Sequence, residues 1–333
     1  MRIVSVELYE VEIPPIPVIA RVWPKIYDIT LCRVLTDEGL EGIGECQGKA
    51  ATLAQQVEAL VGGDPLTLDP FAHGMPFECA LLDIAGQAHG IPIHRFFGQQ
   101  VRDRVPVSYW SCPLEPAETA AEAEIGASRG FTNHKIKARP WNVVETVRCV
   151  REAVGPDYSV GLDPNTQFEQ PAVAARLAAE LEPLGTVANL EDPVLKSNYD
   201  WYRLLREKTF IPIALHLGHP GDVLKALKAE CIDCVNLGGA PLQLRRAAAV
   251  AAAADVPCWV QMGGLCTSVL AAYSVHAQAT IPNATLPCDE LPFTRVADPG
   301  VGLHIAEGHF TVPTAPGLGV TLDMDVVRKY RVG

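Results

Sequence analysis

A repeat of short apolar runs separated by helical patterns limits the folds that this chain can adopt. Helical patterns such as 171–181 and 242–254 lie between the runs. Eight strands alternating with helices, at a period of about 25 residues, predict an α/β fold with a (β/α)8-type barrel. The runs are at 105–111, 135–138, 160–163, 187–191, 213–216, 234–237, 259–262 and 284–286.

The first 104 residues follow a different pattern. Segments 2–13, 29–36 and 40–46 have strand character, and the turn Asp37-Glu-Gly39 separates the last two. Helical spacing follows at 50–61 and 77–90. We therefore expect an α+β domain at 1–104, the barrel at 105–315, and a C-terminal segment, 316–333, that returns to the first domain.

Charge and hydropathy exclude several classes of protein. The chain has 27 Lys and Arg residues against 39 Asp and Glu residues, a net charge of −12, which argues against a nucleic-acid or membrane-surface partner. No apolar run approaches the roughly 18 residues of a membrane span, and the N-terminus lacks a signal-peptide pattern. The ten cysteines show no metal or disulfide framework. We therefore expect a cytoplasmic protein.

Polar side chains close the second to fifth predicted barrel strands. Lys135 and Lys137 are two residues apart, so both project to one face of a strand. Asp163, Glu191 and His216 close the next three runs. Active sites of barrels lie at these strand ends, and buried lysines beside carboxylates are a costly way to fill a core. The pattern predicts an active site, whereas the competing interpretation is a set of rim lysines paired with Asp163 and Glu191.

This set of side chains suits one type of chemistry. Two carboxylates on neighbouring strands can hold a hard divalent cation through oxygen. Such a cation can stabilise the charge that develops when the α-carbon of a carboxylate loses a proton. Lys137 can accept that proton if its pKa falls, and both the charge of Lys135 and the cation favour such a fall.

These motifs resemble those of the enolase superfamily, in particular its muconate lactonizing and mandelate racemase branches. The resemblance rests on Lys135-Ile-Lys137, Asp163-Pro-Asn165, Glu191-Asp-Pro193 and Ile211-Pro-Ile-Ala-Leu215 in this order. Gly42-Ile-Gly-Glu45 and Leu82-Asp-Ile-Ala-Gly-Gln87 extend it to nearly the whole chain.

The resemblance implies a fold, a cofactor and residue roles. It implies an N-terminal domain that caps a modified barrel, a divalent metal, Mg²⁺ in the family, and abstraction of a proton alpha to a carboxylate. Lys137 would be the base and Lys135 its carboxylate-binding neighbour. Asp163 and Glu191 would be metal ligands.

The sequence departs from the family pattern at three strand ends. His216 stands where the family has a third acidic ligand, and it can bind Mn²⁺ or Zn²⁺, contact the substrate, or mark a weakened metal site. Gly238 stands where close relatives commonly have a second lysine, which argues against a two-lysine racemase. The stretch Gln261-Met-Gly-Gly264 lacks the histidine of the mandelate racemase branch.

Further side chains are candidates for substrate contacts. Asn165 and Asn236 are candidates because they lie at or near the ends of predicted barrel strands. Asp289 and Glu290 follow the eighth run and are either a general acid or solvated loop charges. Trp23 lies in the loop 13–25, which either covers the barrel mouth or is an ordinary packed hairpin loop.

Three functional hypotheses follow. The first is a dehydratase or cycloisomerase, in which Lys137 alone removes an α-proton from a small carboxylic acid before elimination or cycloisomerisation. In this hypothesis His216, or an acid after the eighth strand, assists departure of the leaving group. The second is a degenerate, non-catalytic member of the superfamily that binds a small acid or a protein partner. The third is a Schiff-base enzyme that uses Lys135 or Lys137. Barrel enzymes of this kind often associate, so we also expect a homo-oligomer.

Overall fold

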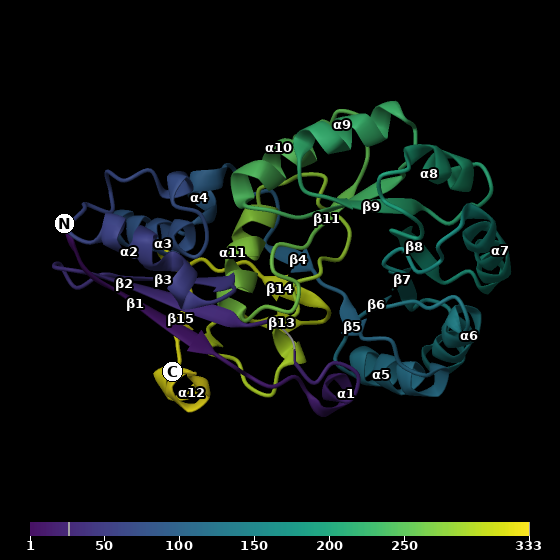
Figure 1. The fold of residues 1–333 in the computed structure, drawn as a ribbon, viewed down its shortest axis with the longest axis horizontal. Helices are drawn as coiled ribbons and strands as arrows, with labels where there is room; N and C mark the ends of the chain where they lie inside the picture. The colour runs from purple at the N-terminus through teal and green to yellow at the C-terminus, as the bar shows by residue number, and fades with distance from the viewer. Residues whose placement is uncertain (26, 333) are drawn as a thin grey trace.

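The computed structural model describes residues 1–25 and 27–332, so Ile26 and Gly333, within the predicted first and last segments, lie outside the described residues. An antiparallel sheet with its helices forms one part of the molecule, and a barrel ringed by helices forms the other (Figure 1). The predicted (β/α)8-type barrel with an N-terminal α+β capping domain is confirmed.

The capping domain is built on a three-stranded meander that is covered by helices. Its strands are β1 (Ile3–Val11), β2 (Ile29–Thr36) and β3 (Glu41–Gln47), in that order. Helix α3 (Phe77–His89) lies directly on β3, where a Cβ atom on Gly42 would overlap the carbonyl oxygen of Ala80. The other helical elements are α1 (Pro17–Ala20), α2 (Ala54–Leu60) and α4 (His94–Phe97), with 3₁₀ turns at Ala50–Leu53 and Pro70–Ala72.

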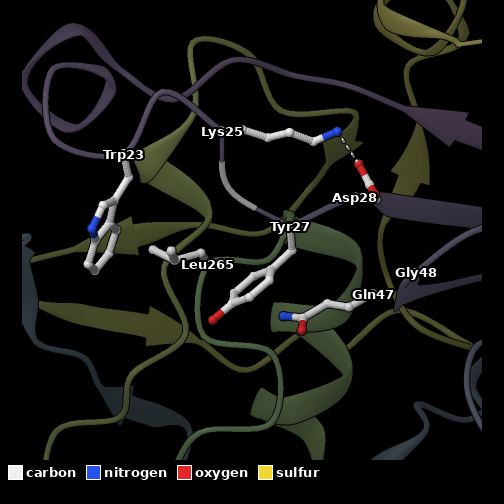
Figure 2. Close-up of a pocket in the computed structure, with 7 residues that line it drawn as sticks. All are labelled: Trp23, Lys25, Tyr27, Asp28, Gln47, Gly48 and Leu265. Atoms are coloured by element: carbon white, nitrogen blue, oxygen red, sulfur yellow. Dashed lines mark ion pairs between the residues drawn. The ribbon is translucent and has the colours of Figure 1, made fainter. Parts of the chain in front are cut away.

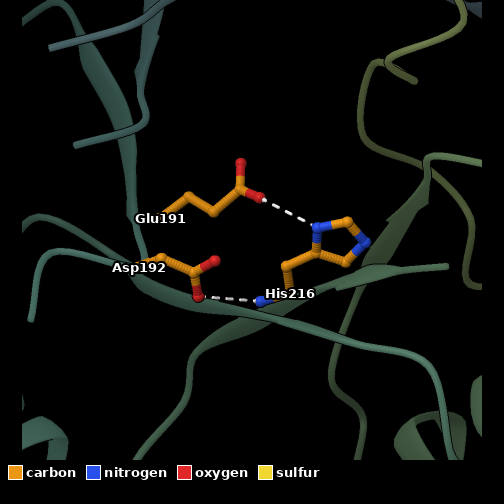
Figure 3. Close-up of side chains that lie close together, drawn as sticks. All are labelled: Glu191, Asp192 and His216. Atoms are coloured by element: carbon orange, nitrogen blue, oxygen red, sulfur yellow. Dashed lines mark hydrogen bonds and ion pairs between the residues drawn. The ribbon is translucent and has the colours of Figure 1, made fainter. Parts of the chain in front are cut away.

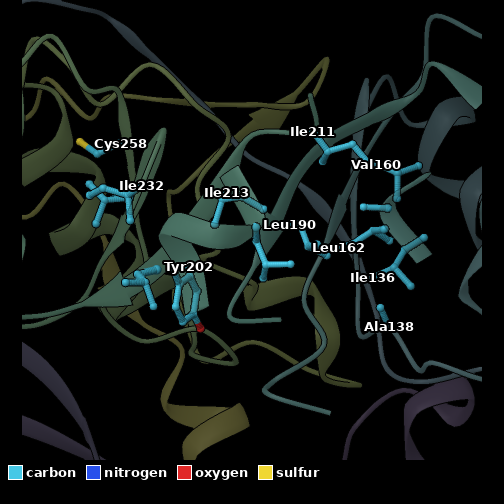
Figure 4. Close-up of a cluster of buried hydrophobic side chains, with 14 of the residues drawn as sticks. Ile136, Ala138, Val160, Leu162, Leu190, Tyr202, Ile211, Ile213, Ile232 and Cys258 are labelled. Carbon is cyan, nitrogen blue, oxygen red and sulfur yellow. The ribbon is translucent and has the colours of Figure 1, made fainter. Parts of the chain in front are cut away.

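Seven parallel strands form the barrel wall, and each is hydrogen-bonded to its neighbours in chain order. Their apolar side chains on the outer face pack against the surrounding helices in one continuous core, which includes Val160, Leu190 and Ile213 (Figure 4). The strands are β5 (Tyr109–Ser111), β6 (Asn133–Ile136), β7 (Ser159–Leu162), β8 (Val187–Glu191), β9 (Ile213–Leu217), β10 (Cys234–Leu237) and β11 (Cys258–Val260). The helices are α5 (Pro116–Ser128), α6 (Val143–Val154), α7 (Pro171–Leu181), α8 (Tyr199–Arg206), α9 (Pro220–Lys228), α10 (Pro241–Ala252) and α11 (Ser268–Gln278), with a 3₁₀ turn at Glu182–Leu184.

The eighth position of the barrel differs from the prediction. The ring closes through residues 286–289, because Asp289 N donates to Val260 O (3.1 Å) and Cys288 N donates to Pro106 O (2.8 Å). The run expected at 284–286 is therefore displaced along the chain and forms an isolated bridge. Pro287 has no N–H group, so a regular ladder cannot run through this segment.

The start of the first predicted run was also wrong. Residues 104–106 form β4 (Arg104–Pro106), which pairs antiparallel with β14 (His309–Thr311) outside the barrel wall. The regular barrel strand β5 begins at Tyr109, while residues 106–108 pair with Cys288 where the ring closes. Pro106 interrupts the run because it cannot donate to a neighbouring strand.

The chain after the barrel runs back to the capping domain. Helix α12 (Met324–Tyr330) lies beside β1, where Glu12 N donates to Tyr330 O and Val332 N to Glu10 O, both at 2.9 Å. The remaining elements are β12 (Gly300–Val301), β13 (Ile305–Ala306), β15 (Thr321–Leu322) and a 3₁₀ turn at Pro292–Thr294. Among the residues that the structure describes, no helix is both long and apolar enough to cross a membrane.

A buried carboxylate joins the capping domain to the barrel. Glu45 of β3 accepts hydrogen bonds from Thr267 N (3.0 Å), Thr267 Oγ1 (2.5 Å) and Leu270 N (3.1 Å). These donors lie at the N-terminus of α11, where free N–H groups and the helix dipole favour a negative charge. All of α11 is buried, because it lies between the barrel and the capping domain.

The close approach of α3 to β3 gives a testable prediction. Gly42→Ala is expected to lower the free energy of unfolding by about 1–3 kcal/mol, because the new methyl group must push α3 away. Urea denaturation followed by circular dichroism measures this change. As a control, Gly161→Ala is expected to change it by less than about 1 kcal/mol, since its Cβ would lie 3.5 Å from the nearest atom. Equal losses in the two variants would contradict the prediction.

Candidate active site

A cavity of about 460 Å³ opens at the carboxyl ends of the barrel strands. Both the barrel and the capping domain contribute to its wall. The polar or charged side chains that line it are Tyr27, Gln47, Lys135, Lys137, Asn165, His216, Gln261 and Asp289, together with the indoles of Trp23 and Trp110.

Lys135 is held at the centre of the barrel by three carboxylates. Its Nζ atom lies 2.6 Å from Glu191 Oε2, 2.6 Å from Asp289 Oδ2 and 3.5 Å from Asp163 Oδ2. Burial alone would lower the pKa of Lys135, but these three charges raise it well above its ordinary value. Lys135 therefore stays protonated and supplies a fixed positive charge.

Lys137 is held less tightly. Its Nζ atom lies 2.5 Å from Asp163 Oδ2, and 14% of its side chain remains exposed, against 6% for Lys135. Burial opposes the ionisation of Asp163, yet Lys135 and Lys137 together lower the pKa of this carboxyl to about 2. Lys137 is thus the lysine that can present its amino group to a molecule in the cavity.

A second group of side chains gathers at the ends of β8 and β9 (Figure 3). Glu191, Asp192 and His216 each offer a ligand atom, and these atoms lie within 4.8 Å of one another. His216 Nδ1 is 3.9 Å from Glu191 Oε1, and Asp192 Oδ1 accepts a hydrogen bond from His216 N (3.0 Å). Burial lowers the pKa of His216 to about 3, so its imidazole is neutral and can act as a ligand.

The charge balance of these residues suits a cation. Burial raises the pKa of Glu191 to about 8, although Lys135 opposes this shift. Three buried carboxylates, from Asp163, Glu191 and Asp289, form ion pairs with two lysines, Lys135 and Lys137. Asn236 donates to Glu191 Oε1 (2.8 Å), and its own Oδ1 is buried with no partner among the described residues. Oxygen donors, a neutral imidazole and a deficit of positive charge together fit a divalent cation.

The structure brings together some of the predicted metal ligands and separates others. Glu191 and His216 lie in one group. Asp163 is instead occupied by Lys137, and Asp192 takes its place beside His216. Asp192 also pairs with Lys196, at 2.8 Å.

The predicted substrate contacts are divided in the same way. Asn165, Trp23 and Asp289 line the cavity. Asn236 is fully buried behind the lining. Glu290 is also fully buried, and its carboxylate accepts hydrogen bonds from Gly263 N (3.1 Å) and Ser274 Oγ (2.8 Å) instead of lining the cavity. The interpretation of Asp289 and Glu290 as solvated loop charges is wrong, because both are buried.

The loop 13–25 lies over the barrel mouth. Ile19 is buried with Trp110 and Leu265, and the rings of Trp23 and Trp110 are 5.5 Å apart. An outer cavity of about 530 Å³ adjoins the first and shares Trp23, Tyr27, Gln47 and Leu265 with it (Figure 2).

Several residues of the site were not predicted. Trp259 Nε1 donates to Asp289 Oδ2 (2.8 Å), and Gln261 Oε1 accepts from Asn236 Nδ2 (3.0 Å). Trp259 lies in β11 and Gln261 directly follows that strand, two residues on, so the sequence carried a usable signal that both side chains project to the same side. No pattern in the sequence points to Gln47 or Tyr27, which reach the cavity from the capping domain.

Comparison with known proteins places this site in a family. The family model described as enolase C-terminal domain-like matches residues 118–326. The chain is 28% identical to the N-succinylamino acid racemase of Amycolatopsis sp., over 96% of this chain and 95% of the relative. It is also 28% identical to the D-xylonate dehydratase of Haloferax volcanii, over 92% of this chain and 86% of the relative.

Solved structures share the fold over the whole chain. The N-succinyl Arg/Lys racemase from Bacillus cereus has a TM-score of 0.87 at 22% identity, covering 100% of this chain and 99% of that chain. The 2-chloromuconate cycloisomerase from Rhodococcus opacus has a TM-score of 0.84 at 22% identity, with 100% of both chains covered. Because the family model spans more than half of the chain, the protein belongs to the enolase superfamily, in the branch of the mandelate racemases and muconate lactonizing enzymes.

Proposed function

We propose that the protein is a lyase or isomerase that removes the α-proton of a small carboxylic acid with Lys137 as its single base. Elimination or cycloisomerisation follows the loss of this proton. The observation that carries the proposal is the inequality of the two lysines. Lys135 is fixed by three carboxylates, whereas Lys137 has one carboxylate partner and lines the cavity.

The two lysines have different roles in this proposal. A general base must reach the proton that it removes, and Lys137 lies at the cavity wall. The fixed positive charge of Lys135 lies close by, because Asp163 Oδ2 is 3.5 Å from Lys135 Nζ and 2.5 Å from Lys137 Nζ. Asp163 orients the amino group of Lys137 through their hydrogen bond. Lys135 also offers its charge to the carboxylate of the substrate from the cavity floor.

Glu191, His216 and either Asp163 or Asp192 would hold a divalent cation. When bound, such a cation stabilises the negative charge that develops on the substrate carboxylate. The charges of the residues support this assignment, because a divalent cation and a carboxylate substrate together would neutralise the three carboxylates and two lysines. The neutral His216 would favour Mn²⁺ or Zn²⁺ over Mg²⁺.

Among the described residues that line the cavity, the opposite wall carries no second lysine. Gly238 follows β10 there, and a Cβ atom at this position would lie 2.8 Å from His216 Nε2. A lysine at 238 would have to displace His216. The relatives named above include racemases, a dehydratase and a cycloisomerase. The one-sided arrangement favours elimination or cycloisomerisation in this chain, because a two-base racemase needs a base on each side.

The outer cavity supports a proposal for the far end of the substrate. Its wall is formed by Trp23, Tyr27, Leu265 and the amide of Gln47, while Lys25 is paired with Asp28 at 2.9 Å (Figure 2). No unpaired charge faces the cavity from these described side chains. A neutral group with apolar and hydrogen-bonding parts fits this wall.

One observation favours the non-catalytic alternative. Lys135 and Lys137 both have ion-pair partners among Asp163, Glu191 and Asp289, and both line the substrate cavity, where they offer positive charge to a small acid. Binding of a small acid without turnover would need no more than this. Stoichiometric metal binding together with solvent exchange at the α-carbon of any ligand excludes this alternative.

The role of Lys137 can be tested with a variant that keeps its charge. Lys137→Arg retains a cation beside Asp163, but a guanidinium does not give up its proton in proteins. The assay follows, by NMR, the incorporation of solvent deuterium at the α-carbon of candidate hydroxy and acylamino acids. We expect its rate to fall about a hundredfold or more in the variant. The control is Lys225→Ala, an exposed lysine of α9 that should leave the rate unchanged. Full exchange in Lys137→Arg would show that another residue is the base.

The metal site can be tested by calorimetry with Mn²⁺, Zn²⁺ and Mg²⁺. Glu191→Gln and His216→Ala are each expected to weaken metal binding by more than about tenfold. Loss of a residue that merely hydrogen-bonds to a metal ligand already weakens binding by about this factor. Asp163→Asn and Asp192→Asn identify the remaining carboxylate, because only the variant that removes a ligand should weaken binding to this extent. Unchanged affinity in both Glu191→Gln and His216→Ala would contradict the proposed ligands.

A further inference from the structure

The interior of the barrel below Lys135 contains a separate cavity of about 180 Å³. Barrels of this type are usually filled here by layers of bulky branched side chains. In this chain small and polar residues occupy these positions on β6, β7 and β8, and Trp259 and Leu286 form the apolar part of the lining. The lining consists of Ser108, Asn133, Lys135, Ser159, Gly161, Ala188, Asn189, Glu191, Trp259, Leu286, Pro287 and Asp289.

Polar side chains run along the wall of this lower cavity. Ser108 Oγ donates to Asn133 Oδ1 (2.6 Å), and Asn133 Nδ2 donates to Ser159 Oγ (2.7 Å). The amide of Asn189 adds further donors and acceptors to the lining. A polar cavity of this size holds several water molecules, whereas apolar cavities stay dry.

The lower cavity reaches solvent at the amino ends of the strands. Ser159, Ala188 and Asn189 are only partly buried; Ser159 opens β7, and Ala188 and Asn189 are the second and third residues of β8. The pairing of these two strands shifts register between Val160 and Gly161, as at a β-bulge. Gly161 adds no side chain to the wall, so the cavity remains open beside Asn189.

The upper end of the lower cavity touches the charged cluster of the active site. Lys135 and Asp289 line both this cavity and the substrate cavity, so they form the partition between the two. Asp289 is 1% exposed, and its Oδ1 atom is buried without a partner in the part of the chain that the structure describes. A buried carboxylate oxygen without a hydrogen bond is costly, and a water molecule in the cavity can satisfy it.

We propose that the lower cavity is a second solvent entrance that holds a chain of ordered water between the amino ends of β7 and β8 and Asp289. This water hydrates the lysine–carboxylate cluster from below. The cluster therefore keeps its contact with solvent when a substrate and the loop 13–25 close the upper cavity. The inference depends on the lining of the cavity and not on the reaction proposed above.

Trp259 provides a direct readout of this entrance. Its indole N–H donates to Asp289 Oδ2, its side chain lines the lower cavity, and it is only 3% exposed. The test follows hydrogen–deuterium exchange of the five tryptophan indole N–H groups by NMR. The signal that disappears in Trp259→Phe belongs to Trp259. If water reaches the lower cavity, the Trp259 proton exchanges although its side chain is buried.

Two variants close the entrance in different ways. Gly161→Val fills the space beside Asn189, and Asn189→Leu makes the wall apolar without removing a hydrogen bond found among the described residues. Each is expected to slow exchange at Trp259 about tenfold or more. If Gly161→Val fails to fold, Asn189→Leu alone decides, because it replaces a side chain by one of similar size.

Trp110, which lines only the upper of the two cavities, is the internal control and should exchange at the same rate in all forms. Destabilised variants exchange faster, so slower exchange cannot result from a loss of stability. Exchange at Trp259 that is unchanged in Asn189→Leu would overturn the proposal. The assay needs neither metal nor substrate, so its outcome is independent of whether Lys137 proves to be the base.

Discussion

The ammonium group of Lys135 among three buried carboxylates is the interaction on which the rest of this structure depends. Asp163, Glu191 and Asp289 come from three different parts of the barrel wall, and all three meet at one nitrogen atom. Removing one partner of a buried ion pair typically costs about 3–5 kcal/mol, because the other charge is left uncompensated. The same contacts that hold the strands together also leave Lys137 as the more accessible lysine beside a permanent positive charge.

The sequence predicted the barrel and its charged centre for a simple physical reason. Parallel strands bring their carboxyl ends to one face, so polar residues that close successive runs must meet there. Lys135, Lys137, Asp163 and Glu191 could therefore be placed together. The pairing of the two lysines with Asp163 and Glu191 was the competing interpretation, and the pairs exist, although Lys135 is buried and not at the rim. The third partner, Asp289, could not be predicted, because it reaches Lys135 only when the ring closes. For the same reason, the position of Asp192 beside His216 depends on the backbone after β8, where Asp192 has a φ of 46°.

The closure of the ring shows a second limit of periodic patterns. An apolar run reports that a segment is buried, but it does not report which backbone groups are paired. Residues 284–286 are followed by Pro287, and the bridging hydrogen bonds fall on the residues around that proline. The polar floor of the barrel was missed for a related reason. Ser108, Ser159 and Asn189 are unremarkable one by one, and only the closed ring turns them toward a common cavity.

Strand β3 of the capping domain has two tasks that are only two residues apart. Glu45 caps the N-terminus of α11, and the side chain of Gln47 donates to Gly263 O (2.8 Å) while it lines the substrate cavity. The wall of the substrate cavity that contains Gln47 is therefore anchored to the barrel at the N-terminus of α11. The wall that carries Trp23 lies on the loop 13–25, which is held through its backbone, because Ile16 N donates to Thr294 O (3.0 Å) and Ile13 O accepts from Arg295 (2.9 Å). New substrate preferences can thus evolve through the loop, since changes there leave the anchored wall and the charged centre intact.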